Sequence, residues 1–564
     1  MKLSIPFLLV ICGTFSQISA KSSSRRREQD ANGSMQCNVK RINGMVRPGQ
    51  AAVPTQYICH DTEQIYNLSG DVKSFFEGED TKSGNIEINV PYSAIEPDGN
   101  IAITNNEVSP INVTNRRKLY GTSITGKRKV LVVRVSNDNI LREKVEQDEK
   151  KLYWDVFGDE NNLKKVYKRC SGNKLKFVPA TGYLVNRGVI TVSPPQSVCG
   201  MNFKSVSNHA KAQLVGLNID TDHFMYIMPD CADFEGAEAW GEMNGTDTWI
   251  PSRNGSVALV QVHEVGHNLG LGHSGAEYDD YGDKTCFMGA QVPWDDKGAK
   301  MCFNAGKLWS LGWYSKHHGS FKPDKYGVKA NLIGIGEAQT RGGAVVKEKV
   351  IVKLSSSINK NASHLYLRYN NGKGPNQGVV GDKNKVVITQ QYSRSSDSHI
   401  KAALGPGETY YGTNWDARGN TLVVKHCGFT KGSWGDSPRL ASANIVAYVQ
   451  GETSKNCSVF GNALVSNAIK APDDSFPGTS SRDSDSDYNR HKSSVYDDSE
   501  TASEPGSCVD IPGFYDAYGS DYNCAWYEQE EFLCTSSGSD VPNVNGLTAA
   551  NACCTCGGGQ YIVT

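Results

Sequence analysis

The chain has 564 residues, with 59 basic and 60 acidic side chains and a hydrophobic fraction of 38%. Its length exceeds what one hydrophobic core supports, so we expect several domains. Because the formal net charge is only −1, no strong positive field is expected, which argues against a nucleic-acid partner or a polybasic membrane anchor.

The N-terminus has the features of a secretory signal. Lys2 precedes an apolar run from Leu3 to Cys12, and Ala20 is a small residue suited to cleavage. The run is too short to span a bilayer, and the sequence carries no later transmembrane segment or lipid-anchor signal. We therefore predict a signal peptide over 1–20 and a secreted protein. Sixteen cysteines agree with export, as do Asn-x-Ser/Thr sequons at Asn32, Asn67, Asn112, Asn244, Asn254, Asn361 and Asn456.

Residues 21–118 contain no catalytic constellation, and we interpret them as a pro-segment that restrains an enzyme during export. Basic clusters lie at both ends, at Arg25-Arg26-Arg27 and at Arg116-Arg117-Lys118. Each cluster is either a processing site or a solvated charge run.

Alternating strand and helix patterns fill residues 119–325. The apolar, β-branched run 129–135 predicts a central strand. Further strands are expected at 174–178, 188–192 and 224–228, and helices at 140–156, 162–169 and 256–269, the last with Asn254 or Ser256 as N-cap. This order predicts an α/β domain in which a mixed sheet packs on the last helix.

That last helix carries the motif H-E-x-x-H-x-x-G-x-x-H over residues 263–273. His263 and His267 are four residues apart, so both imidazoles leave one face of a helix. Gly270 allows a positive φ that ends the helix, and His273 then returns as a third ligand. The motif predicts one catalytic Zn²⁺ held by three histidines, with Glu264 as the base that acts on a water molecule.

Met288 follows His273 by fifteen residues, after a turn-rich stretch. A methionine here is either core filler or a Met-turn, a soft apolar floor beneath the zinc histidines, and we favour the Met-turn. Some zinc peptidases with this turn add a tyrosine ligand two residues later. That position is Ala290, so three histidines and water are expected.

Three further regions follow the predicted peptidase domain. Residues 326–470 contain repeated short strands with turns between them, which predicts an all-β, sandwich-like domain. Residues 471–507 are rich in Ser and Asp and are expected to form a flexible linker.

The third region, residues 508–564, is a small C-terminal module with six cysteines, at Cys508, Cys524, Cys534, Cys553, Cys554 and Cys556. Disulfides are favoured over a zinc site, because export to an oxidising compartment favours disulfides. Aromatic residues such as Phe514, Tyr515 and Trp526 are either its minimal core or a contact surface for polysaccharide or matrix.

With these motifs in view, the chain resembles gametolysin, a metzincin family of cell-wall lytic zinc peptidases. The resemblance rests on the zinc motif, on 130–135, on 188–192 and on 302–314, and it extends more weakly through the β-rich region to about residue 460. It implies a secreted endopeptidase that cuts extracellular matrix or cell-wall glycoproteins. It also implies that His263, His267 and His273 bind zinc, that Glu264 is the base and that Met288 is the Met-turn.

Three other functions are alternatives to this one. Ser274 after the third histidine is similar to matrix metalloproteases, which makes that family the runner-up. A catalytically inactive, matrix-binding protein would tend to lose Glu264 or a histidine, and all are present. A zinc amidase or deacetylase would not need the Met-turn.

The cysteine count gives a further expectation. Six cysteines lie in the tail and nine lie upstream of it after the signal, so at least one upstream cysteine is unpaired if all disulfides are internal. Cys37 or Cys59 in the pro-segment could occupy the open zinc position as a cysteine switch, or the two could form a bridge. A disulfide between Cys286 and Cys302 is expected, and Asp279, Asp280 and Asp283 are a candidate Ca²⁺ site.

Overall fold

The structure is a computed structural model. It describes residues 34–112, 124–465 and 508–561, with gaps at 61–63, 71, 73–85, 92–93, 97–99, 104–108, 290–293, 295–299, 341–347, 360–361, 395, 431–441, 454, 460–463, 513, 516–522, 525–546 and 557–559. The predicted signal peptide, both basic clusters and the predicted linker lie outside the described residues. None of the helices in the described ranges is long and apolar enough to cross a bilayer. The chain divides into two compact units, 1–474 and 475–564.

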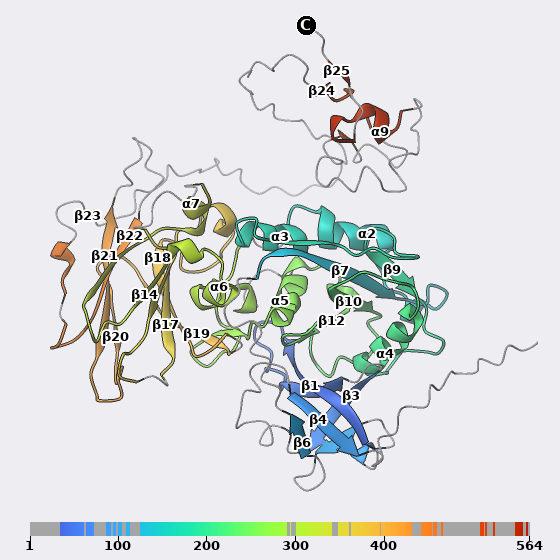
Figure 1. The fold of residues 1–564 in the computed structure, drawn as a ribbon, viewed down its shortest axis with the longest axis horizontal. Helices are drawn as coiled ribbons and strands as arrows, with labels where there is room; N and C mark the ends of the chain where they lie inside the picture. The colour runs from blue at the N-terminus through green and yellow to red at the C-terminus, as the bar shows by residue number, and fades with distance from the viewer. Residues whose placement is uncertain are drawn as a thin grey trace, which may run out of the picture. The chain divides into compact units, whose positions relative to one another are not determined.

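A largely parallel sheet forms the centre of the predicted peptidase region (Figure 1). Its strands are β7 (Gly126–Val135), β8 (Leu175–Pro179), β9 (Val189–Val192), β10 (His223–Met228), β11 (Ala239–Glu242) and β12 (Asp247–Pro251). All the pairings are parallel except that of β11 with β12, which is antiparallel. This confirms the strands predicted at 129–135, 174–178, 188–192 and 224–228.

Both faces of this sheet are covered, which explains the continuous apolar run in β7. Val130 and Val132 join the core formed with α2 (Glu149–Tyr153), α3 (Leu163–Cys170) and α5 (Ala258–Asn268). Leu131 and Val133 join a second core with α4 (Phe203–Leu214). A strand buried on both faces has no polar alternation to show in its sequence.

The helices agree less closely with the sequence predictions than the strands do. The predicted helix 140–156 is broken into a 3₁₀ turn at Leu141–Glu143, α2 and a π turn at Trp154–Gly158. The helix α4 was not predicted, although Asn202 caps it by accepting from the Lys204 N–H. The predicted N-cap of α5 was wrong: Val257 takes that position without a side-chain bond, because Asn254 donates to Glu238 and Ser256 to Asp155.

The N-terminal region adds six strands to the same sheet: β1 (Ser34–Met45), β2 (Gln56–His60), β3 (Ile65–Gly70), β4 (Ile86–Pro91), β5 (Ile101–Ile103) and β6 (Ser109–Asn112). The junction is the antiparallel pairing of β1 with β11, in which Asn43 lies opposite Gly241 and Gly44 opposite Trp240. The region predicted as a pro-segment therefore closes the open edge that β11 would otherwise present.

The β-rich region consists of two sheets that share one apolar core. The first sheet contains β13 (Ser274–Ala276), β14 (His318–Phe321), β16 (Ile351–Leu354), β17 (His364–Asn370), β18 (Lys385–Gln391) and β19 (Ser398–Leu404). The second contains β15 (Val328–Leu332), β20 (Thr409–Gly412), β21 (Leu422–Thr430), β22 (Ser442–Val449) and β23 (Leu464–Val465). The β-rich region also contains one short helix among its described residues, α7 (Ile335–Thr340).

The first of these sheets is not confined to the region predicted for the β-rich domain. It takes β13 and β14 from the predicted peptidase region, and β13 runs parallel to β19 with Ser274 opposite Ser398. β13 follows directly after His273, so this pairing brings the β-rich region to the zinc motif.

Four disulfides are present in the described part of the first unit: Cys37–Cys59, Cys170–Cys302, Cys199–Cys231 and Cys427–Cys457. The predicted Cys286–Cys302 bond was wrong, because Cys302 lies beside Cys170 at the end of α3. Cys286 is a buried free cysteine, and it supplies the unpaired thiol that the odd count requires. Burial raises the pKa of this thiol to about 12.

The second unit is described only in part. β24 (Cys508–Val509) pairs with β25 (Gln560–Tyr561), and a short helix, α9 (Ala549–Ala552), precedes the last cysteines. Cys524 is bonded to Cys553, and Cys554 and Cys556 are also in disulfides. Phe514 is buried, which favours a role in the core of the module for that aromatic residue.

Candidate metal centre

The helix α5 holds the first two histidines of the motif on one face. Every residue of α5 is buried, including His263 and His267, and their ring centroids lie 4.9 Å apart. The helix ends in a Schellman turn, in which the Leu271 N–H donates to the Gly266 carbonyl and the Gly270 N–H to the His267 carbonyl. Gly270 has a φ of 83°, the left-handed conformation predicted for the turn glycine.

The turn returns His273 to the other two histidines. Its ring centroid lies 5.4 Å from that of His263 and 4.8 Å from that of His267. One nitrogen from each of the three side chains lies within 4.8 Å of the others. The structure thus brings together the three side chains that the sequence predicted as ligands.

Backbone carbonyl groups orient two of these rings. Nδ1 of His263 lies 2.9 Å from the Phe287 oxygen, and Nδ1 of His267 lies 2.7 Å from the Leu271 oxygen. A carbonyl oxygen only accepts hydrogen bonds, so in each ring Nδ1 carries the proton and the Nε2 lone pair is free. Among the described residues, the buried Nε2 atoms of all three histidines have no hydrogen-bond partner.

Burial also sets the protonation state of the three rings. It lowers the pKa of His263 to about 4, and it lowers the pKa of His267 and His273 well below the ordinary value. Neutral imidazoles are therefore expected at pH 7. Three convergent neutral nitrogens fit a divalent first-row metal such as zinc, for which imidazole is a preferred ligand.

Glu264 lies beside this cluster, and its carboxylate is buried. Neither of its carboxylate oxygens has a hydrogen-bond partner among the described residues, and burial raises the pKa of the carboxyl well above its ordinary value. Gly241 of β11 packs directly on it: a Cβ at Gly241 would lie 2.8 Å from Oε2 of Glu264 and 3.1 Å from Cβ of His267. Gly241 was missed in the sequence, where it is one of 57 glycines with no local signal.

Met288 lies against the helix that carries the histidines. Its thioether sulfur is 2.6 Å from where a Cβ on Gly266 would stand, between His263 and His267 in the sequence. Met288 is fully buried, within a 3₁₀ turn that also supplies the Phe287 carbonyl to His263. The residue therefore lies on the helix beneath the site, as a floor would. Ala290 lies outside the described residues.

Tyr281, which the sequence analysis does not single out, also lies at this site. Its ring centroid lies 4.5 Å from that of His273 and 6.2 Å from that of His263. Its hydroxyl donates to the carbonyl of Gly44 in β1. Burial, with the charge of Glu264 as the next contribution, raises the pKa of the phenol, so it remains a hydrogen-bond donor.

Two predicted functions for other residues do not fit the structure. Cys37 and Cys59 are bonded to each other, so neither presents a thiolate as a cysteine switch requires. Asp283 of the candidate Ca²⁺ loop turns inward, where its oxygens accept from Ser274, Thr285 and Asn304. In the described ranges, the three histidines are the one cluster with a metal-binding arrangement.

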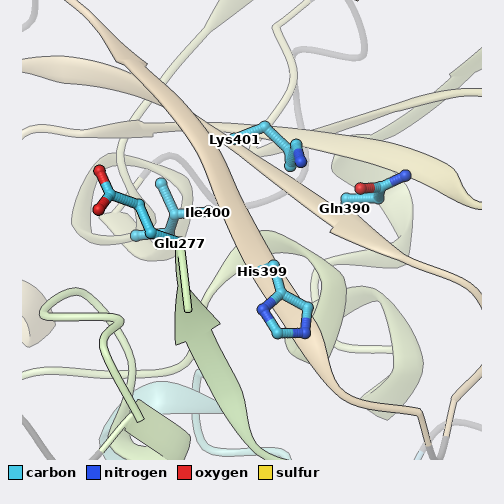
Figure 2. Close-up of a pocket in the computed structure, with 5 residues that line it drawn as sticks. All are labelled: Glu277, Gln390, His399, Ile400 and Lys401. Carbon is cyan, nitrogen blue, oxygen red and sulfur yellow. The ribbon is translucent and has the colours of Figure 1, made fainter. Parts of the chain in front are cut away.

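A separate hollow of about 370 Å³ lies beyond the end of β13 (Figure 2). It is lined by Glu277, Gln390, His399, Ile400 and Lys401, and none of these is a predicted site residue. Apart from Ile400, the side chains that line this hollow are polar.

The comparisons with known proteins bear on this region. The family described as gametolysin peptidase M11 matches residues 144–395. Neither the curated proteins nor the solved structures gave a match. The matched range contains all three histidines, Glu264, Met288 and the β-rich strands as far as β18. Residues 144–395 are therefore similar to the gametolysin peptidases.

Proposed function

We propose that this protein is a secreted, zinc-dependent endopeptidase of the metzincin type. The observation that carries the proposal is the convergence of three neutral, buried imidazoles, each with a free Nε2, beside the buried carboxylate of Glu264. His263, His267 and His273 would hold the metal, and Met288 would support the helix beneath them. Zinc at this position would supply Lewis-acid activation of water and of the scissile carbonyl group.

Glu264 is assigned the proton transfers. Its carboxylate takes a proton from the attacking water as the oxygen bonds to the carbonyl carbon. It then gives that proton to the amide nitrogen as the C–N bond breaks, so that one water is consumed for each peptide bond cut. No described residue forms a hydrogen bond with its oxygens, which leaves the carboxylate available for this exchange.

Tyr281 is placed to donate a hydrogen bond near the histidines. In this structure its hydroxyl binds the Gly44 carbonyl of a strand paired with β11. A peptide substrate paired along β11 would present its own carbonyl groups in the same region. We assign Tyr281 to substrate orientation.

Residues 21–118 are proposed to keep the enzyme latent. The support is the pairing of β1 with β11 at Gly241, the residue that packs against Glu264. Latency in this proposal depends on an occupied strand edge and not on a cysteine ligand.

The natural substrates are proposed to be extracellular matrix or cell-wall glycoproteins, on the strength of the gametolysin-like region. The disulfides fit an oxidising, extracellular compartment. The C-terminal module is proposed to bind matrix or polysaccharide.

Hydrolysis of a broad protein substrate by the mature enzyme tests the function, with a Glu264→Ala variant alongside and the zinc content measured on both. We expect zinc in both proteins and turnover lowered by about 10²–10⁴ in the variant, the usual contribution of a general base. Equal turnover in the two proteins would remove Glu264 from the mechanism. Loss of zinc in the variant would make it a ligand instead.

A further inference from the structure

The third histidine depends on a part of the chain far away in the sequence. The Asp397 carboxylate accepts a hydrogen bond from the His273 N–H at 2.7 Å. The Ser398 N–H donates to the His273 carbonyl at 2.9 Å. Both backbone groups of His273 are thus bonded to residues at the start of β19, more than a hundred positions later in the chain.

This segment, residues 396–398, also lies close to Gly272, the residue before His273. A Cβ on Gly272 would lie 2.5 Å from Oδ1 of Asp397 and 2.8 Å from the Ser396 carbonyl carbon. Any side chain at position 272 would therefore push the segment away. The pairing continues beyond His273, where Ser274 lies opposite Ser398 in the parallel β13–β19 pair.

Buried polar groups hold the segment in place. The Ser398 and Ser274 hydroxyls lie 3.0 Å apart, and Nδ2 of Asn304 lies within 3.0 Å of both. Nζ of Lys307, which is fully buried, donates to the Ser396 carbonyl at 2.9 Å. Asn304 and Lys307 lie at the start of α6 (Ala305–Leu311) and within it, so the segment is fixed to a rigid element.

The three histidines are therefore positioned in different ways. His263 and His267 share a fully buried helix, and their rings bond to the Phe287 and Leu271 carbonyls. His273 lies beyond the end of that helix, and its backbone is fixed by Asp397 and Ser398. Without those two hydrogen bonds, the turn after Gly270 would be freer to move, and the imidazole of His273 would move with it.

We propose that Asp397 is a positioning residue of the metal centre, and that the β-rich region completes the site by fixing His273. This proposal rests on the proposed function, because it requires His273 to be a ligand. Asp397 is not one of the three clustered side chains that could hold a metal; it acts through the backbone of His273. The predicted peptidase region, 119–325, would then be unable to hold zinc at full affinity without the segment at 396–398.

The hydrogen bond from the His273 N–H to Asp397 predicts that two substitutions of Asp397 differ in their effect on zinc binding. Asp397→Ala removes the acceptor, whereas Asp397→Asn retains an Oδ1 that can accept from the His273 N–H. Changes in such outer partners typically weaken metal binding by about 10–100-fold. We expect this loss in the alanine variant and a change within about threefold in the asparagine variant. Asp397 is itself exposed, so neither change opens a cavity.

The experiment uses the full chain and measures zinc affinity by competition with a chelator. The same variants are loaded with Co²⁺, whose visible spectrum reports the geometry of the ligands. Lys401→Ala, an exposed change on the same strand β19, is the control and should leave both readouts unchanged. Gly272→Ala should weaken zinc binding as Asp397→Ala does, because it displaces the segment while Asp397 is intact. The thermal unfolding midpoint of each metal-free variant separates lost positioning from lost folding.

Two results would overturn the inference. Zinc affinity and a Co²⁺ spectrum like those of the unmodified chain in Asp397→Ala would show that His273 needs no such support. An equal loss in Asp397→Asn would assign the effect to the negative charge and not to positioning. His273→Ala distinguishes these results from a failure of the proposed function, because unchanged zinc binding in that variant would mean that His273 is not a ligand at all.

Discussion

At the scale of single residues, the site is defined by buried polar atoms to which no other described residue forms a hydrogen bond. Nε2 of His263, His267 and His273 and both carboxylate oxygens of Glu264 are buried without hydrogen-bond partners in the described part of the chain. An unpaired buried polar group costs about 1–3 kcal/mol. Five such atoms in one place are therefore expected to meet a ligand, and a metal ion with a water molecule fits their chemistry.

The lowered pKa values of the histidines predict how the stability of the metal-free protein depends on pH. Between pH 6.5, the ordinary pKa, and about 4, the pKa of folded His263, the unfolded chain binds a proton at this position and the folded chain does not. The contribution of His263 to the free energy of unfolding should therefore fall as the pH is lowered through this window. His263 alone accounts for a loss on the order of 3 kcal/mol.

Denaturant unfolding of the metal-free chain at pH 7 and at pH 5 measures this effect. A His263→Gln variant should lose less stability than the unmodified chain between these two pH values. His209→Gln, on α4 and away from the site, is the matched control and should behave as the unmodified chain does. The explanation fails if His263→Gln and the unmodified chain show the same pH dependence.

Gly241 gives a second prediction at this scale. A Cβ there would lie 2.6 Å from the Glu264 carbonyl oxygen and 2.8 Å from Oε2, so Gly241→Ala must displace the helix or the carboxylate. Since a displacement of about 1 Å can lower a rate about 10²-fold, we expect turnover to fall at least about tenfold with zinc retained. Kinetics and metal analysis on the same preparation check this.

Gly336→Ala in α7 is the control for that substitution, because its Cβ would meet its nearest neighbour at an ordinary 3.4 Å. Turnover in Gly241→Ala equal to that of the control would show that β11 does not constrain Glu264.

At the scale of elements, the helix α5, which carries His263 and His267, is held in place by burial and by its C-terminal turn. All of α5 is buried, so its amphipathic pattern is weak and packing determines its position. The turn depends on Gly270, whose φ is 83°.

Gly270→Ala should therefore destabilise the protein. A left-handed conformation costs an alanine roughly 1–2 kcal/mol, and its Cβ would also lie 2.1 Å from Oδ1 of Asn244. We expect the free energy of unfolding to fall by at least this amount, together with weaker zinc binding. Chemical denaturation measures the first effect. An unchanged midpoint would mean that the turn relaxes without strain.

The parts of this site that are local in the sequence could be predicted, and the parts that come from tertiary packing could not. The zinc motif, Gly270 and Met288 lie within 26 consecutive residues, and helix geometry alone relates the first two histidines. Gly241, Tyr281 and Asp397 reach the site through sheet pairing or loop packing, which leaves no spacing to read. The same limit applies to the disulfide of Cys302, whose partner on α3 is determined by the fold.

At the scale of the whole molecule, sheets cross the predicted domain boundaries. The N-terminal strands extend the central sheet through β1 and β11, and β13 links the zinc motif to the β-rich region through β19. Regions that are distinct in sequence composition are therefore joined by backbone hydrogen bonds at strand edges. This explains how residues at both ends of the first unit can influence one site.

The proposed latency, which rests on the β1–β11 pairing, predicts how activity would arise. Cutting the chain between β6 and β7 should not be sufficient, because β1 remains paired with β11 without a covalent link. Activity should appear only as the N-terminal fragment dissociates, and adding the fragment back should inhibit.

Size-exclusion chromatography of the cut protein, with activity measured on each fraction, checks this prediction. A fragment-bound fraction as active as the fragment-free fraction would contradict it, as would full activity of the uncut chain.

The most direct test of the central claim is X-ray absorption at the zinc edge, made on the mature protein loaded with one zinc ion. The account predicts three imidazole nitrogens and one oxygen at about 2.0–2.2 Å, with no sulfur. The His263→Ala variant should lose this signal together with the bound zinc. A sulfur ligand at about 2.3 Å, or an unchanged spectrum in that variant, would show that zinc binds elsewhere and would contradict the account.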